Sequence, residues 1–250
     1  TTAGWGEATE ASEEIGLPLL LGTEITAVDE DVSVHMLAFQ YDPSNEHISS
    51  MFANTRAARL RRTKRMVERL SQDFPITWDD VLAQVKEGER TTIGRPHIAD
   101  ALVAAGVYET RSDAFADAVS AKSKYYIPTP SPSTHEVIAA VKGAGGVVVA
   151  AHAGDPQRNR RLLSDEQLDA MIADGLDGLE IWHRGNPPEQ RERLLTIVAR
   201  HDLLVTGGSD WHGKGKPNGL GENLTDDDTV REILHRGVDL IGRVGSSHAA

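Results

Sequence analysis

The chain has 250 residues, with 38 acidic against 26 basic side chains, which gives a formal net charge of −12. A chain of this sign is not expected to coat duplex DNA, because nonspecific binding to phosphates needs a basic field. The sequence contains no cysteine, so disulfides, thiolate metal sites and cysteine nucleophiles are excluded, and any metal must be held by His, Asp or Glu.

The sequence also argues against a membrane protein. No apolar stretch approaches the roughly 20 residues that a transmembrane helix needs, and the first residues do not have the layout of a signal peptide. We therefore expect a cytoplasmic protein. The sequence does not predict the oligomeric state.

The first part of the chain predicts one helix and two strands. Residues 7–15 have a helical pattern that a glycine and a proline end. Residues 17–25 (LPLLLGTEI) predict a strand that ends at Glu24, and residues 32–41 (VSVHMLAFQY) predict a second strand.

The character of the sequence changes over residues 45–123, where helical patterns follow one another without a strand between them. These patterns cover residues 54–70, 77–88 and 95–106. The proline-rich residues 125–134 form an exit linker. We expect an inserted helical subdomain at 45–123, within a main domain made of residues 1–44 and 124–250.

The rest of the chain alternates helices with short apolar strands. The predicted helices cover residues 134–144, 164–174, 187–201 and about 227–236, and the predicted strands cover 146–152, 178–183 and 203–210. Strands separated by helices of this length imply parallel pairing, and a series of them suggests a barrel. The predicted fold class is therefore α/β.

Acidic and imidazole side chains recur in these strands or directly after them. In a parallel barrel the carboxyl ends of the strands meet at one rim, which brings distant groups together. Such ligands favour Zn, Mn or Fe, and bridging carboxylates suit centres with several ions. One such histidine alone is more often a satisfied polar residue than a ligand, but a series of them is not expected by chance. The residues are Glu24, His35, His152, Glu180, His183, Asp210 and His212.

Other polar side chains are candidates for binding a phosphate group. Two of them start the predicted helix 95–106, where main-chain N–H groups attract anions, although an ordinary surface arginine and a structural helix start would give the same pattern. Two more lie at the exit linker, and two directly follow LEIW at 179–182. These candidates are Arg95, His97, Lys124, Tyr125, His183 and Arg184.

The basic run from Arg56 to Arg69 has two interpretations. It is either a face along which RNA lies or a solvated helix that uses arginine because arginine favours helices. The second interpretation is favoured.

Four motifs together resemble the PHP (polymerase and histidinol phosphatase) metallophosphoesterases. They are GTEITA at 22–27, SVHMLAF at 33–39, AAHAG at 150–154 and GGSDWHG at 207–213, with the helical insertion between the second and the third. Together with GRPHIADAL at 94–102, they are more similar to the nucleoside 3′,5′-bisphosphate phosphatases, which also trim short RNA from the 5′ end, than to histidinol phosphatase.

The resemblance implies a distorted seven-stranded (β/α) barrel that holds up to three Mn, Fe, Zn or Mg ions. It makes Glu24 the bridging carboxylate, lets His35 and His152 complete the shell of one ion, and assigns Asp210 and His212 to the others. Catalysis would then depend on Glu24, His152 and Asp210, with a metal-bridging hydroxide that hydrolyses phosphate from a nucleotide or a short RNA.

The chain departs from this family in one respect. The family begins with a strand that bears His-x-His and continues to a Thr-Asp-His-Asp segment, whereas this sequence opens at Thr1 and Thr2, after both. We expect about fifty residues and two strands of a family barrel to be absent here, so that two of the three metal positions lack ligands.

Other functions stay open at this point. The chain would also suit a noncatalytic nucleotide-binding protein that uses the rim and the basic insertion. A histidinol-phosphatase-like enzyme and an amidohydrolase are further alternatives, although the second usually brings a lysine to its site, for which the sequence offers no clear candidate.

Overall fold

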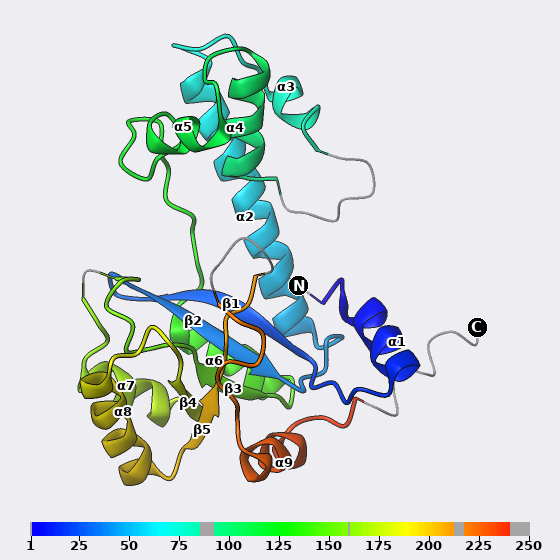
Figure 1. Ribbon diagram of the computed structural model, residues 1–250, viewed down its shortest axis with the longest axis vertical. Helices are drawn as coiled ribbons and strands as arrows, with labels where there is room; N and C mark the ends of the chain where they lie inside the picture. Colours follow the sequence, from blue (N-terminus) through cyan, green and yellow to red (C-terminus); the bar gives the residue numbers. More distant parts are fainter. Residues whose placement is uncertain (1, 86–92, 160, 213–217, 241–250) are drawn as a thin grey trace. The chain divides into compact units, whose positions relative to one another are not determined.

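The computed structural model describes residues 2–85, 93–159, 161–212 and 218–240. The chain divides into two compact units. The first is formed by Thr1–Met51 together with Ser131–Ala250, and the second by Phe52–Pro130 (Figure 1).

The first unit is a mixed α/β structure built on a single five-stranded sheet within the described residues. Its strands are β1 (Gly22–Asp29), β2 (Val32–Phe39), β3 (Val147–Ala150), β4 (Gly178–Trp182) and β5 (Leu204–Gly207). Its helices are α1 (Trp5–Ile15), α6 (Thr134–Gly143), α7 (Asp165–Ala173), α8 (Pro188–His201) and α9 (Asp227–Arg236). These bounds agree with most of the helices predicted from the sequence.

The strands lie in the order β1-β2-β3-β4-β5, and only part of the sheet is parallel. Strands β3, β4 and β5 pair in parallel, as their helical connections predict. The prediction is wrong for β2, which pairs antiparallel with both β1 and β3. The reason is a two-residue turn at Glu30 and Asp31, which reverses β2 against β1, so that β2 alone runs opposite to the other strands.

The position of Glu24 also differs from the prediction. Glu24 is the third residue of β1 and not the end of a strand, because β1 starts at Gly22 and continues to Asp29 in register with β2. The apolar residues 17–21 lie before the strand.

Apolar side chains fill both faces of the sheet. Val147 and Val149 of β3 pack with Leu37 of β2 and with Ile233 of α9 on the face that also carries Glu24. On the opposite face Met36 is fully buried, as are its neighbours Ala38 and Val148, and α6 packs against β1, β2 and β3 (Figure 1).

The second unit contains helices alone in its described part. They are the greater part of α2 (Glu46–Leu70), α3 (Trp78–Leu82), α4 (Arg95–Ala104) and α5 (Arg111–Ala116). The core includes Met66, Leu70, Ile98 and Leu102, all fully buried. Helix α3 is shorter than the predicted helix 77–88, whose residues 86–88 lie outside the described part. Helix α5 was not predicted; the Thr110 capping box begins this short helix.

The basic run in α2 is not a uniformly solvated face. Arg61 and Arg65 are exposed, but Arg62 is buried, stacks its guanidinium 5.1 Å from the centre of the Tyr126 ring, and donates to the Ile127 carbonyl. Arg62 therefore contributes to the packing of this unit.

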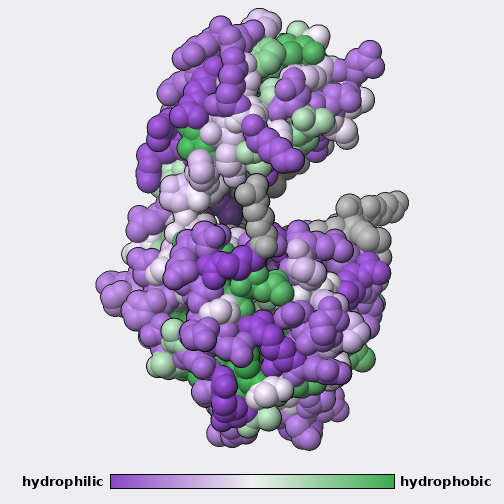
Figure 2. Space-filling view, turned by 90° about the vertical axis from the view of Figure 1, so that its left-hand side faces the viewer, coloured by the Kyte–Doolittle hydropathy of each residue, from purple (hydrophilic) through white to green (hydrophobic). Residues whose placement is uncertain are grey.

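Hydrophilic side chains cover most of the face drawn in Figure 2, with apolar side chains gathered in small patches. Across the part of the chain that the structure describes, none of the helices is both long enough and apolar enough to cross a bilayer.

Candidate metal centre

The register of the sheet brings the first three predicted ligands together. His35 pairs with Thr26 of β1, two residues from Glu24, so both side chains project from the same face. On the other side of β2, the Ala151 N–H donates to the His35 carbonyl at 2.9 Å, which places His152 beside His35. The hairpin and the end of β3 thus converge at one point of the sheet.

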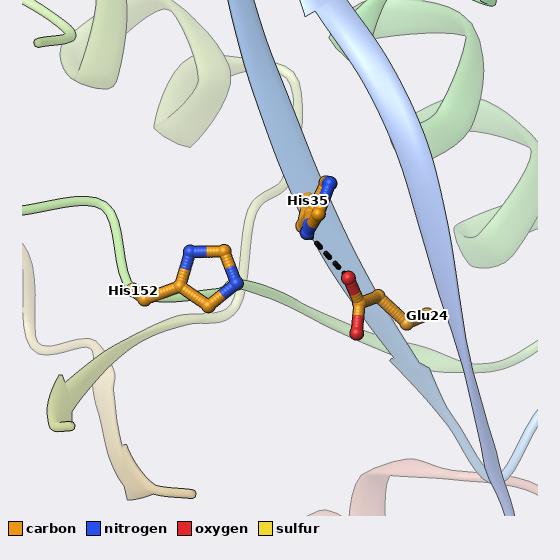
Figure 3. A group of neighbouring side chains, drawn as sticks. All are labelled: Glu24, His35 and His152. Carbon is orange, nitrogen blue, oxygen red and sulfur yellow. Dashed lines mark ion pairs between the residues drawn. The ribbon is translucent and has the colours of Figure 1, made fainter. Parts of the chain in front are cut away.

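The three side chains turn toward one another (Figure 3). Glu24, His35 and His152 each offer one ligand atom, and these atoms all lie within 4.8 Å of one another. His35 Nδ1 forms a close ion pair with the Glu24 carboxylate, and His152 Nε2 is buried with no partner among the described residues. An unpaired buried imidazole nitrogen beside a histidine–carboxylate pair fits a divalent cation, because such a nitrogen is rarely left without a partner inside a protein.

The pKa values of Glu24 and His152 are shifted in the directions that favour metal binding. The contact with His35 holds the pKa of the Glu24 carboxyl below its ordinary value, so Glu24 stays ionised. Burial lowers the pKa of His152 to about 3, and the positive charge of Arg158 acts in the same direction. A neutral imidazole keeps a free lone pair, which is the form that binds metals.

Glu180 supports His152 from β4. Its carboxylate accepts a hydrogen bond from the main-chain N–H of His152 at 2.8 Å and is buried, with 4% of the residue exposed. Burial raises the pKa of Glu180 to about 7. A Cβ atom on Gly208 would lie 2.0 Å from Glu180 Oε1, so the absence of a side chain at 208 makes room for this carboxylate.

Asp210 and His212 lie next to each other after β5. His212 Nδ1 is 3.2 Å from Asp210 Oδ1, and the side chain of Asp210 is 8% exposed against 56% for His212. The group whose ligand atoms lie within 4.8 Å of one another contains Glu24, His35 and His152 but not Asp210 or His212, so the structure does not place these two among the same ligands. Gly213, the last residue of the GGSDWHG motif, lies outside the described residues.

Two of the predicted ligands have a left-handed backbone. The φ angle is +34° at His152 and +49° at Asp210. Residues other than glycine adopt this region at a cost of about 1–3 kcal/mol, and such strain is concentrated at functional sites.

Arg158 brings a positive charge into the site, which the sequence did not predict. Its Nη2 atom lies 2.5 Å from Asp210 Oδ2 and its Nε atom lies 3.2 Å from Asp155 Oδ2. Arg158, Asp155, His35 and His152 line one cavity of about 210 Å³.

His183 continues the row of imidazoles. The ring centres of His35 and His152 lie 5.2 Å apart, as do those of His152 and His183. His183 Nδ1 accepts a hydrogen bond from the Gly185 N–H, and Nε2 is buried without a partner among the described residues. The adjacent Arg184 forms an ion pair with Glu222 at 3.0 Å.

The other predicted substrate-binding residues belong to the second unit. Arg95 donates to the Val119 carbonyl and stacks on an aromatic ring, while His97 Nδ1 accepts from the Gly94 N–H at the start of α4. Lys124 forms an ion pair with Asp73 at 2.8 Å, and the hydroxyl of Tyr125 donates to the same carboxylate. Their roles toward a substrate stay predictions.

Asn186 is a further residue that the sequence did not single out. Its fully buried side chain donates to the carbonyls of Glu180 and Ile181 and accepts from the Gly154 N–H, which ties the loop after β4 to the loop after β3. No pattern in the sequence marks Asn186 or Arg158, because their partners lie in other segments or depend on a loop conformation.

We expect Asn186→Ala to lower the free energy of unfolding by about 2–4 kcal/mol, because it removes three buried hydrogen bonds, those to the Glu180 and Ile181 carbonyls and that from the Gly154 N–H. Urea denaturation measures this loss. Asn45→Ala, at a half-buried asparagine whose side-chain hydrogen bonds are exposed to solvent, should cost about 1 kcal/mol. Equal losses in the two variants would contradict this role of Asn186.

Known proteins similar to this chain act on phosphate esters. A 3′,5′-nucleoside bisphosphate phosphatase from Chromobacterium violaceum is 26% identical over 222 residues, which cover 86% of this chain and 75% of that protein. A 5′-3′ exoribonuclease Rnm from Salmonella typhimurium is 29% identical over 216 residues, which cover 85% and 72%. No family model matches the chain.

One solved structure is much more similar. It is the crystal structure of a candidate metal-dependent phosphoesterase from Bifidobacterium adolescentis, with 98% sequence identity and a TM-score of 0.86. The similarity covers 97% of this chain and 85% of that chain.

Proposed function

We propose that this chain, which belongs to the PHP family of metallophosphoesterases, is a metal-dependent hydrolase that removes phosphate from nucleotides. The observation that carries the proposal is the convergence of Glu24, His35 and His152, whose ligand atoms lie within 4.8 Å of one another. The preferred substrates are nucleoside 3′,5′-bisphosphates, followed by the 5′ ends of short RNA.

Glu24, His35 and His152 would hold one divalent cation, and Asp210 and His212 are the proposed ligands of others, up to three in all. Mn, Fe, Zn and Mg all suit carboxylate and imidazole ligands. When bound, such ions polarise phosphoryl oxygens and lower the pKa of water.

The residues of the chain have separate tasks in this proposal. Glu24 keeps its negative charge at the ions, neutral His152 presents Nε2, and Glu180 fixes the main chain of His152. His183 and Arg184 would contact the substrate from the first unit. In the second unit Arg95, His97, Lys124 and Tyr125 are the proposed contacts to its phosphates, since guanidinium and ammonium groups bind phosphate strongly.

The finer architecture is part of the same proposal. The five-stranded sheet would form a portion of a distorted (β/α)7 barrel made of residues 1–44 and 124–250. Residues 45–123 would form the inserted helical subdomain.

A turnover assay tests the function. The full chain, loaded with Mn²⁺, should release phosphate from adenosine 3′,5′-bisphosphate, and EDTA should stop the reaction. Binding of this nucleotide without turnover in any of the four metals would support the noncatalytic alternative and reject the proposal.

Short RNA as a second substrate gives a separate prediction. Replacing the exposed Arg61 and Arg65 with glutamine should weaken cleavage of a short oligonucleotide several-fold and leave hydrolysis of a mononucleotide unchanged, because the oligonucleotide offers additional phosphates for basic side chains to bind. Steady-state rates on both substrates measure the effect. Arg62 is left intact because it is buried. Equal effects on the two substrates would show that this face does not bind RNA.

A further inference from the structure

Arg158, which lines the same cavity as His35 and His152, forms a close ion pair with Asp210. The two side chains approach to 2.5 Å, and they are 27% and 8% exposed. A buried carboxylate needs a positive partner, and removal of that partner is costly. In this structure the guanidinium of Arg158 supplies the positive charge.

Both oxygens of the Asp210 carboxylate are engaged by neighbouring side chains. Oδ2 faces Arg158, and Oδ1 faces His212 Nδ1 at 3.2 Å. A divalent cation bound to Asp210 would therefore lie beside the guanidinium of Arg158. The positive charges of the cation and of the guanidinium repel each other strongly in a poorly solvated site.

Asp155 offers Arg158 a second carboxylate close by. Its Oδ2 lies 3.2 Å from Arg158 Nε, and its Oδ1 accepts a hydrogen bond from the Gln157 N–H at 2.9 Å, which holds the carboxylate in place. The guanidinium can leave Asp210 without losing its other ion pair. Other arginines of the region have different partners, since Arg184 pairs with Glu222 and Arg191 donates to the His183 carbonyl.

We propose that Arg158 is the internal counterion of Asp210 in the metal-free protein, and that a divalent cation displaces its guanidinium when it binds Asp210. Arg158 then rests on Asp155 alone. The exchange keeps Asp210 neutralised in both states and lowers the affinity of this position for the cation. The inference rests on the proposed metal site, and it assigns Arg158 a positioning role there.

Titration of EDTA-treated full-length chain with Mn²⁺ tests the exchange without substrate. Arg158→Gln should bind Mn²⁺ at least about tenfold more tightly than the unchanged chain, because no guanidinium competes for Asp210. The gain should disappear in the background of Asp210→Asn. Arg161→Gln is the matched control, because Arg161 is a nearby arginine that pairs with the exposed Glu30 and Asp31. The Mn²⁺ affinity of this variant should equal that of the unchanged chain.

Thermal unfolding gives a second measurement. Without metal, Arg158→Gln should melt at a lower temperature than the unchanged chain. Addition of Mn²⁺ should raise the melting temperature of Arg158→Gln by more than it raises that of the unchanged chain. Equal or weaker Mn²⁺ binding by Arg158→Gln would overturn the exchange. If the unchanged chain binds no Mn²⁺, both this inference and the proposed function fail; if it binds and the variant does not differ, only the exchange fails.

Crystals of the unchanged chain with and without Mn²⁺ keep the test independent of any variant. With Mn²⁺ on Asp210, we expect Arg158 to contact Asp155 and to have left Asp210. An Arg158–Asp210 contact that persists beside the bound cation would overturn the proposal.

Discussion

Replacing Glu24 with glutamine is expected to reduce hydrolysis of a nucleoside 3′,5′-bisphosphate by at least about a hundredfold and to reduce the bound metal. The substitution keeps the size of the side chain but removes the negative charge of Glu24 beside His35 and His152. A neutral amide is a weaker ligand for a divalent cation than a carboxylate. Phosphate release and metal analysis of the same preparation measure the two effects together.

A second glutamate of the same hairpin provides the control. Glu30 lies in the turn between β1 and β2 and forms an exposed ion pair with Arg161, so Glu30→Gln should leave turnover and metal content unchanged. If Glu24→Gln retained full activity with normal metal content, Glu24 would not be a ligand.

The second large effect is expected at Gly208, where alanine would place a Cβ atom 2.0 Å from Glu180 Oε1. The carboxylate is buried, and the shift that relieves the contact at Oε1 is expected to weaken the hydrogen bond that Oε2 accepts from the His152 N–H. We expect metal affinity to fall about 10–100-fold, as for other residues that orient a ligand, and the free energy of unfolding to fall by about 1–3 kcal/mol. Metal titration and urea denaturation measure these changes.

Gly219→Ala is a matched control in the same part of the chain. The nearest atom to a Cβ there is Glu222 Oε2 at 3.5 Å, an ordinary contact, so neither metal affinity nor stability should change appreciably. Unchanged metal binding by Gly208→Ala would show that Glu180 does not hold His152 in its binding position.

Local patterns in the sequence were sufficient to predict most elements of the fold. The helices α6, α8 and α9 begin and end within about two residues of the predicted positions, because capping residues such as Ser133 and Asp226 mark where two of them begin. The direction of β2 was not predictable in the same way. It depends on whether the chain reverses at residues 30 and 31, and a two-residue turn there decides the pairing of three strands.

The candidate site was predicted in its ligand types but not in its surroundings. Histidines and carboxylates near strand ends are visible in a sequence, and three of them, Glu24, His35 and His152, do lie together. Glu24 and His35 come from the antiparallel hairpin of β1 and β2, and His152 follows β3. The site is therefore not formed only by the carboxyl ends of parallel strands, as the sequence had suggested. Arg158 was not found because its partner Asp210 is 52 residues away in the sequence.

Anomalous diffraction from crystals of the full chain grown with Mn²⁺ tests the metal site most directly. The account predicts a manganese peak enclosed by the Glu24 carboxylate, the Nδ1 atom of His35 and the Nε2 atom of His152. A map in which Mn²⁺ binds elsewhere, with these three side chains free of metal, would contradict it.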